Sequence, residues 1–149
     1  DPAWAKPELA DTWNQLRELR DEVNQVLEQA RSAKDIGSSL QAKALIYVAD
    51  TQLREQLKAM NPSDAVAAGS SHVDEVRYLL LVSQVEILDS PDGLKDIKYR
   101  SESDAFGIGI VDADGKKCDR CWNYSTHVGE SAAHETICER CVDALDGKF

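Results

Sequence analysis

The stretch CDRCWNYSTHVGESAAHETICERC, residues 118–141, holds all four cysteines of this 149-residue chain. They form two C-x-x-C pairs, Cys118 with Cys121 and Cys138 with Cys141, separated by 16 residues. Two residues between thiolates let both sulfurs face one ion from a tight turn, and two such turns complete the closed tetrahedral shell of structural zinc. The spacing therefore predicts one structural Zn²⁺ bound by the four cysteines.

Other uses of four cysteines fit this pattern less well. A disulfide framework suits a small secreted chain dense in cysteine, and a thioredoxin-like motif needs a single C-x-x-C at a helix start. Iron is not excluded from a four-sulfur site by softness or geometry, so that alternative stays open. Catalytic zinc needs an open coordination position, whereas four thiolates fill the shell and leave His127 and His134 as surplus loop residues.

Basic and aromatic residues surround the two cysteine pairs. Four thiolates around Zn²⁺ carry a net charge of about −2, and Arg120 and Arg140 lie where they can either offset that charge or contact a phosphate. Lys116 and Lys117 precede the first pair and extend the same positive cluster. Trp122 directly follows the first pair, where we expect it to pack against the metal-binding turn, with stacking on a nucleobase as the alternative.

A long amphipathic helix is predicted near the N-terminus. Apolar residues recur at spacings of three and four from Pro7 to Lys34, and Gly37 is the expected stop. At about 100° per residue, four cations fall within an arc of about 100° beside the apolar stripe: Arg17, Arg20, Arg31 and Lys34. These cations either pair with nearby acids or contact an anionic partner.

The segment between this helix and the cysteines predicts a small α+β unit. We expect strands at 40–50, 82–88 and 106–111, an edge strand within 95–104, and helices at 51–60 and 72–80. Turns are expected at 89–93 and 114–115, and a short turn or half-helix at 63–71. The whole is α+β: a long N-terminal helix from a helical bundle, a small mixed α/β subdomain, and a C-terminal four-cysteine zinc ribbon or knuckle. The expected domain boundaries are 1–37, 38–113 and 114–149.

Composition limits how this chain meets other molecules. The net charge is −10 and the pI about 4.7, so the mean field repels phosphate backbones and disfavours nonspecific nucleic-acid binding. Hydrophobic residues make up 42% and charged residues 30%, which is typical of a globular protein rather than a disordered tail. Contact with a nucleic acid therefore has to run through locally segregated cations.

Two separated motifs resemble one family. The run W-x-x-L-R-x-L-R-D-E-V-N-x-V-L-E-x-A-R-x-x-K-x-I-G-S-S-L-x-A, residues 13–42, resembles the end of the anticodon-binding helical domain of bacterial or organellar isoleucyl-tRNA synthetases. The terminal K-C-x-R-C-W-x-Y…G…I-C-x-R-C is similar to the C-terminal zinc finger of those enzymes, a motif related to that of formamidopyrimidine-DNA glycosylases. Between them, L-L-L-V-S-Q-V-E-I looks like the family's small connecting subdomain.

The resemblance implies a non-catalytic, tRNA-binding part of a class I, ATP-dependent isoleucine–tRNA ligase, because the family's catalytic signatures and a phosphate loop are missing from these residues. Its expected partners are tRNA(Ile), through the anticodon stem and loop, and the catalytic and editing domains of the parent enzyme. The expected state is a cytoplasmic monomer, with plastid stroma and mitochondrial matrix as alternative compartments, and no membrane partner. The RNA-binding candidates are Arg17, Arg20, Arg31, Lys34, Lys116, Lys117, Arg120, Trp122 and Arg140.

The sequence is also compatible with two other functions. One is a free-standing zinc-knuckle module that binds a protein through its helix. The other is a DNA-binding zinc finger of the formamidopyrimidine-DNA glycosylase type.

Metal removal should unfold one end of the chain selectively. The cysteine segment has few apolar residues, so metal binding supplies its folding free energy. A chelator should abolish amide-exchange protection across residues 116–145 and leave the helix at 8–34 protected. Loss of protection in the helix ahead of the cysteine segment would contradict this prediction.

Overall fold

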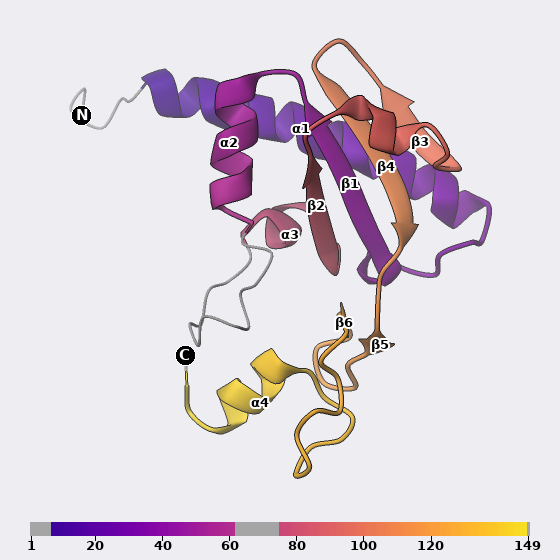
Figure 1. The fold of residues 1–149 in the computed structure, drawn as a ribbon, viewed down its shortest axis with the longest axis vertical. Helices are drawn as coiled ribbons and strands as arrows, with labels where there is room; N and C mark the ends of the chain where they lie inside the picture. The colour runs from indigo at the N-terminus through magenta and orange to yellow at the C-terminus, as the bar shows by residue number, and fades with distance from the viewer. Residues whose placement is uncertain (1–6, 62–74, 149) are drawn as a thin grey trace.

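The computed structural model describes residues 7–61 and 75–148, which form an α+β body with a small cysteine-rich unit attached to it (Figure 1). The helices are α1 (Pro7–Ser32), α2 (Thr51–Ala59), α3 (Glu75–Leu80) and α4 (Glu139–Leu145), with 3-10 turns η2 (Ser39–Gln41) and η3 (Pro91–Leu94). The strands are β1 (Ala42–Val48), β2 (Gln84–Leu88), β3 (Tyr99–Glu102), β4 (Phe106–Asp112), β5 (Lys116–Lys117) and β6 (Tyr124–Ser125). The predicted α+β class is confirmed.

The long helix forms as its periodicity predicts, but it ends earlier than Gly37. The N–H of Asp35 donates to the carbonyl of Ala30 at 3.1 Å, and the N–H of Lys34 donates to Arg31 at 2.9 Å. This is a Schellman termination, and Lys34 occupies its left-handed position with φ of 63°. The early turn brings Ile36 back into the core, where it is 5% exposed. Lys34 therefore lies past the helix and not on its basic flank.

The body is built on a four-stranded sheet with the order β2-β1-β4-β3. β1 is parallel to β2 and antiparallel to β4, and β3 is antiparallel to β4 at the far edge. The predicted edge strand within 95–104 is therefore confirmed as β3. Opposite pairs such as Ile46 with Ile108 place apolar side chains on one face of the central strands.

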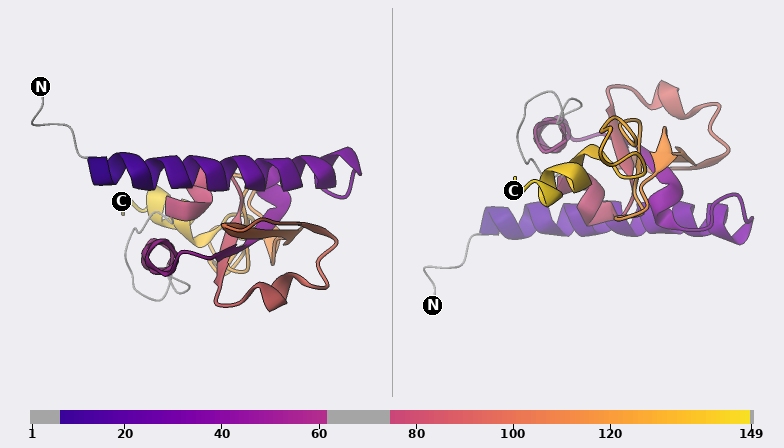
Figure 2. Two further views of the ribbon diagram at one scale, coloured as in Figure 1. Left: turned by 90° about the horizontal axis from the view of Figure 1, so that it is seen from above. Right: turned by 90° about the horizontal axis from the view of Figure 1, so that it is seen from below.

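α1 covers that apolar face of the sheet, as seen from two further directions in Figure 2. Leu19, Val23, Val26 and Ala30 are each 0% exposed and lie in one core cluster with the side chains of β1 and β4. α2 and α3 join the same cluster, and α2 lies beside β2 in Figure 1. The boundary predicted at residue 37 stays a prediction, but residues on its two sides share one core.

The opposite face of β4 explains the F-G-I-G-I pattern of this strand. A Cβ at Gly107 or Gly109 would lie only 2.7 or 2.8 Å from the side chain of Leu94 in η3. The glycines therefore let η3 approach the sheet closely, and Leu94 is 0% exposed there. Large residues face α1 and small ones face η3, which is the two-residue alternation of a strand.

The shorter elements follow the local sequence. Asp50 caps α2 by accepting the N–H of Leu53 at 2.8 Å, and Ser90 caps η3. The turn predicted at 63–71 and the first residues of the helix predicted at 72–80 lie outside the described residues. Within 7–61 and 75–148, no helix has the length and apolar character needed to span a membrane.

Truncating the buried side of α1 should destabilise the whole body. Leu19→Ala removes a fully buried side chain and should lower the free energy of unfolding by about 2–5 kcal/mol, because a cavity forms between helix and sheet. Leu9→Ala on the same helix removes a side chain that is 49% exposed, and is the matched control. Chemical denaturation followed by circular dichroism measures both; equal small effects would mean that α1 is not part of the core.

Candidate metal centre and its surroundings

The structure brings all four cysteines together around one point. Their sulfur atoms lie within 4.8 Å of one another, with 3.8 Å between the Sγ atoms of Cys118 and Cys141 and 3.7 Å between those of Cys121 and Cys138. A tetrahedral zinc site with Zn–S distances of about 2.3 Å has edges of about 3.8 Å. The four sulfurs therefore fit a single structural zinc, as the spacing predicts.

The first cysteine pair is enclosed by a short hairpin. β5 pairs with β6, and Lys117 lies opposite Tyr124, so the turn that carries Cys118 and Cys121 lies between the two strands. The N–H of Cys118 donates to the carbonyl of Asn123 at 2.8 Å, which closes this turn. The hairpin thus encloses the first pair.

The second pair lies at the start of α4. Cys138 is the residue before the helix and Cys141 is in its first turn, and the N–H of Cys138 donates to the sulfur of Cys118 at 3.3 Å. The two turns are joined by a backbone hydrogen bond of 3.0 Å from Asp119 to Thr136. Hydrogen bonds from the backbone therefore help to orient the sulfurs.

The electrostatics of the cluster call for a cation. Burial raises the pKa of the Cys118 thiol, but hydrogen bonds from the backbone of Cys121, Cys138 and Arg120 outweigh it and bring this pKa down to about 6. Burial raises the pKa of the Cys138 and Cys141 thiols. Four thiolates this close can coexist only with a divalent ion between them, since metal coordination removes the thiol protons.

The two arginines of the cysteine pairs differ in their surroundings. Burial raises the pKa of the Cys141 thiol, and a hydrogen bond with the side chain of Arg120 opposes that rise. Arg140 is half-buried and stacks over the ring of Tyr78 in α3, with 5.0 Å from its guanidinium carbon to the ring centroid. Burial lowers the pKa of Arg140, the like charge of Arg77 lowers it further, and the charge of Cys141 opposes these shifts. Both arginines therefore counter the negative charge of the thiolates.

Trp122 does not pack against the metal-binding turn, so that expectation is wrong. Its side chain is 61% exposed and its backbone is left-handed, with φ of 66°. Its N–H donates to the carbonyl of Cys118 at 2.9 Å, and this bond closes the turn and directs the indole outward. The ammonium of Lys117 lies 4.7 Å from the ring centroid, and Lys116 beside it is also exposed.

The predicted cations of α1 are all exposed. Arg31 forms an ion pair of 2.6 Å with Glu28, as the pairing alternative predicts. Within the described part of the chain, no hydrogen bond or ion pair of the Arg17, Arg20 or Lys34 side chains is found. Among the described residues, an acidic partner is therefore found for Arg31 and not for the other three cations.

Sequence reasoning missed the residues that join the cysteine unit to the body. Ser83 is a buried polar residue, 1% exposed, and its hydroxyl oxygen accepts the N–H of Tyr124 in β6 at 2.7 Å. The amide of Gln84 exchanges two hydrogen bonds with the backbone of Asp114, of 2.8 and 2.9 Å. No local pattern marks these two residues, because both partners lie at least 30 positions away.

Comparison with known protein families defines the class of this site. Residues 115–144 match the model of a zinc finger found in FPG and IleRS. The site is therefore a zinc finger of that type, and hereafter residues 115–144 are called the finger.

Similarity to isoleucine–tRNA ligases extends along nearly the whole chain. It is 63% identical over 98% of its length to an isoleucine–tRNA ligase of Nostoc sp., 59% over 96% to one of Acaryochloris marina, and 56% over 98% to one of Gloeothece citriformis. The chain spans only about 15% of the length of these relatives. The chain is thus homologous to a segment of isoleucine–tRNA ligases, and the predicted resemblance is confirmed.

A close backbone contact makes Gly115 necessary to the finger. Its φ is +87°, and a Cβ there would lie 2.2 Å from the carbonyl oxygen of Ser125. Gly115→Ala should weaken zinc retention by about 1–3 kcal/mol beyond the effect of backbone strain alone. Gly147→Ala is the matched control, because Gly147 also has a positive φ, of +73°, but no atom within 4 Å of the added carbon. Competition with a chromogenic chelator measures both variants, and equal losses would contradict the role of the contact.

Proposed function

We propose that this chain is the tRNA-docking part of an isoleucine–tRNA ligase and carries no catalytic residues of its own. The homology to isoleucine–tRNA ligases supports this assignment, as does the zinc finger. The whole enzyme's reaction, the ATP-dependent joining of isoleucine to tRNA(Ile), would be carried out by the remainder of the parent protein. The chain acts there as a monomeric appendage in the cytoplasm or an equivalent organellar compartment.

One observation carries the proposal: an exposed indole held on a metal-supported turn beside two cations. Unpaired RNA bases stack on aromatic side chains, while lysines contact the backbone phosphates. Trp122 is 61% exposed, and Lys117 lies over its ring. Exposing an indole to water is unfavourable. The backbone nevertheless holds the Trp122 side chain outward, which supports a binding role for it better than a packing role.

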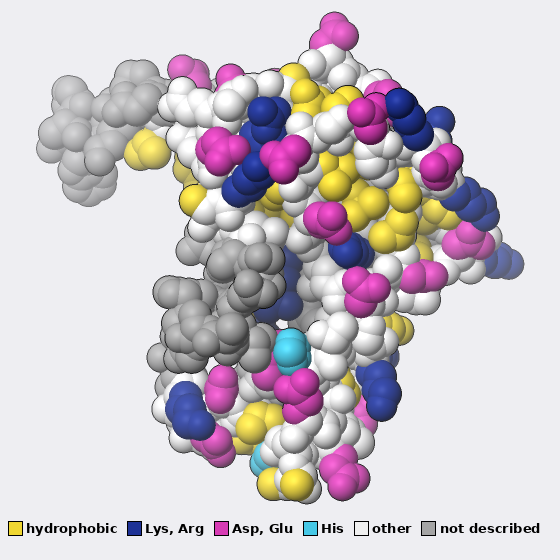
Figure 3. Space-filling view, viewed as in Figure 1, with side chains coloured by type: hydrophobic (Ala, Val, Ile, Leu, Met, Phe, Trp, Pro, Cys, Tyr) yellow, Lys and Arg dark blue, Asp and Glu magenta, His cyan; other side chains and the backbone are white. Residues whose placement is uncertain are grey.

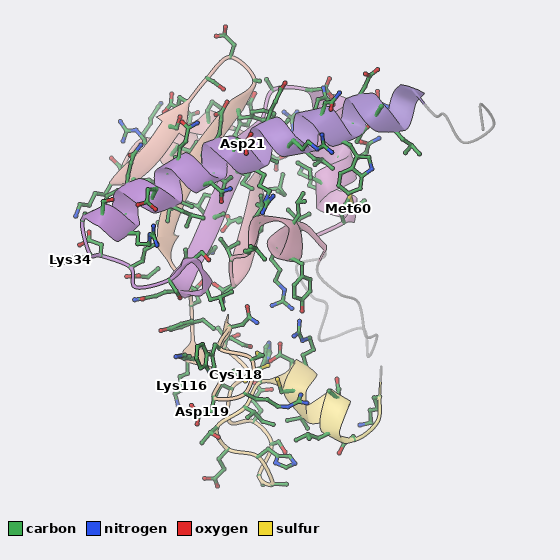
Figure 4. All side chains as sticks on the ribbon, turned by 180° about the vertical axis from the view of Figure 1, so that it is seen from behind. Asp21, Lys34, Met60, Lys116, Cys118 and Asp119 are labelled. Atoms are coloured by element: carbon green, nitrogen blue, oxygen red, sulfur yellow. The ribbon has the colours of Figure 1, made fainter. Side chains whose placement is uncertain are left out.

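The charge distribution favours contact at a few points over contact along a continuous basic face. Figure 3 shows acidic and basic side chains intermixed on the face it presents, in keeping with the net charge of −10. Lys34 at the end of α1 and Lys116 at the base of the finger lie toward the same side of the molecule in Figure 4. Both side chains of the Arg31–Glu28 ion pair are exposed to solvent. An incoming phosphate can therefore replace the carboxylate at little cost in free energy.

The two finger arginines have smaller roles in this proposal. Arg120 interacts with Cys141, and Arg140 stacks on Tyr78. We therefore assign RNA contact first to Trp122 with Lys116 and Lys117, and then to Arg17, Arg20 and Arg31 of α1 and to Lys34 just beyond it. The anticodon loop is the proposed target because its bases are unpaired and can be stacked.

Removing the exposed indole should weaken tRNA binding without disturbing the fold. Trp122→Ala should lower affinity for tRNA(Ile) by about five- to a hundredfold, the range for loss of one base stack. Trp13→Ala is the matched control, since Trp13 is 54% exposed on α1. Filter binding at one fixed salt concentration, with a noncognate tRNA and a DNA duplex alongside and zinc content checked, measures the effect. Unchanged affinity in Trp122→Ala would contradict the proposal, and preference for the DNA duplex would favour the glycosylase-type alternative.

A further inference from the structure

The finger is attached to the body through a short connection whose backbone is hydrogen-bonded to the body at two successive residues. Only Ala113, Asp114 and Gly115 separate β4 from β5. The N–H of Ala113 donates to the carbonyl of Gln41 at 2.8 Å, and the next residue has both backbone groups bonded to the amide of Gln84. A flexible linker would leave such groups to water. Here the body holds the N–H of Ala113 and both backbone groups of Asp114.

The side-chain amide of Gln84 pairs with this connection in the way that a backbone amide of a neighbouring strand would. Its side-chain Nε2 donates to the carbonyl of Asp114, and its Oε1 accepts the N–H of the same residue. This donor–acceptor pair copies the exchange of two hydrogen bonds between strands. Gln84 thereby extends the sheet pairing to the chain that enters the finger. Lys43 adds a 3.4 Å contact to the carboxylate of Asp114.

Ser83 makes a second attachment, directly to the finger. Its hydroxyl donates to the carbonyl of Leu40 and its oxygen accepts the N–H of Tyr124. A hydroxyl with one donor and two acceptor sites can hold a body carbonyl and a finger amide at once. The side chain is buried, so losing it would leave the Tyr124 N–H without its partner in a site shielded from water.

A third attachment comes from the metal-binding helix. Arg140 of α4 and Arg77 of α3 both stack on the ring of Tyr78, at 5.0 and 5.1 Å from its centroid. The three attachments lie in the connection that precedes β5, in β6 and in α4, and three separate points remove rotation as well as translation of the finger (Figure 1). The finger is therefore docked in one orientation.

We infer that Ser83 and Gln84 are positioning residues that fix the finger on the body, so that Trp122 and the α1 cations meet one tRNA together. This rests on the proposed function, because it assigns both surfaces to the same RNA. Each residue acts on tRNA only through the finger. Losing this preorganisation lowers affinity because the two surfaces no longer bind as one rigid unit.

The test uses the zinc-loaded chain and separates orientation from binding. Residual dipolar couplings measure the orientation of the finger relative to the body in wild type, Ser83→Ala, Gln84→Ala and the double variant. Gln52→Ala in α2 and Ser101→Ala in β3 are the matched controls, since Gln52 is exposed and neither residue hydrogen-bonds to the finger. Filter binding then measures tRNA(Ile) affinity of the same samples.

We expect both zinc content and the protection of amides within each unit to stay unchanged. The couplings of the finger should shrink relative to those of the body, and tRNA affinity of the double variant should fall about tenfold. Gln84→Ala, which truncates a half-buried side chain, is the variant that decides the question if loss of the buried serine hydroxyl disturbs the fold.

Each other outcome counts against a defined part of the inference. An unchanged finger orientation in the double variant would overturn the positioning role, whatever the RNA affinity. A loosened finger with unchanged tRNA affinity would overturn the claim that both surfaces act together. Wild-type protein that binds no tRNA would overturn the proposed function, while the dipolar couplings would still decide whether Ser83 and Gln84 dock the finger.

Discussion

The coordination of one cation by four closely packed sulfurs is the interaction on which the C-terminal part of this protein depends. Sulfur atoms 3.7–3.8 Å apart cannot all be thiolates without a positive ion among them. The finger has only Val128 and Ile137 as partly buried hydrophobic residues packed around its cysteines. Metal coordination therefore supplies the stabilisation that a hydrophobic core supplies in the rest of the chain.

The body depends on ordinary apolar burial, and the two kinds of stabilisation meet at β2. α1 buries one apolar stripe against the central strands, and this core positions the start of β2. From there Ser83 hydrogen-bonds to the finger and Gln84 to the residue that precedes it. Hydrogen bonds are directional, so a small junction of this kind sets orientation while contributing modestly to stability.

The surface follows from the same arrangement. The turn around Cys118 needs a left-handed residue to close, and Trp122 occupies that position with its indole in solvent. The proposed RNA contact rests on this indole and the two lysines beside it, since the mean field of an acidic protein opposes contact elsewhere. Homology to isoleucine–tRNA ligases agrees with such a role.

How much was predictable depended on the range of the interactions. The Cys118–Cys141 spacing, the period of α1, the cap at Asp50 and the alternation in β4 are local patterns, so the sequence by itself determined the metal site, the long helix and the α+β class. The early end of α1 at Ser32, with Lys34 in the left-handed position, was not predictable, because the need to bury Ile36 outweighed the preference for glycine. Only the tertiary structure decided the outward direction of Trp122, the stacking of Arg140 on Tyr78 and the docking of the finger by Ser83 and Gln84. These contacts join residues far apart in the chain, and no periodicity or spacing in the sequence encodes which distant groups will satisfy one another.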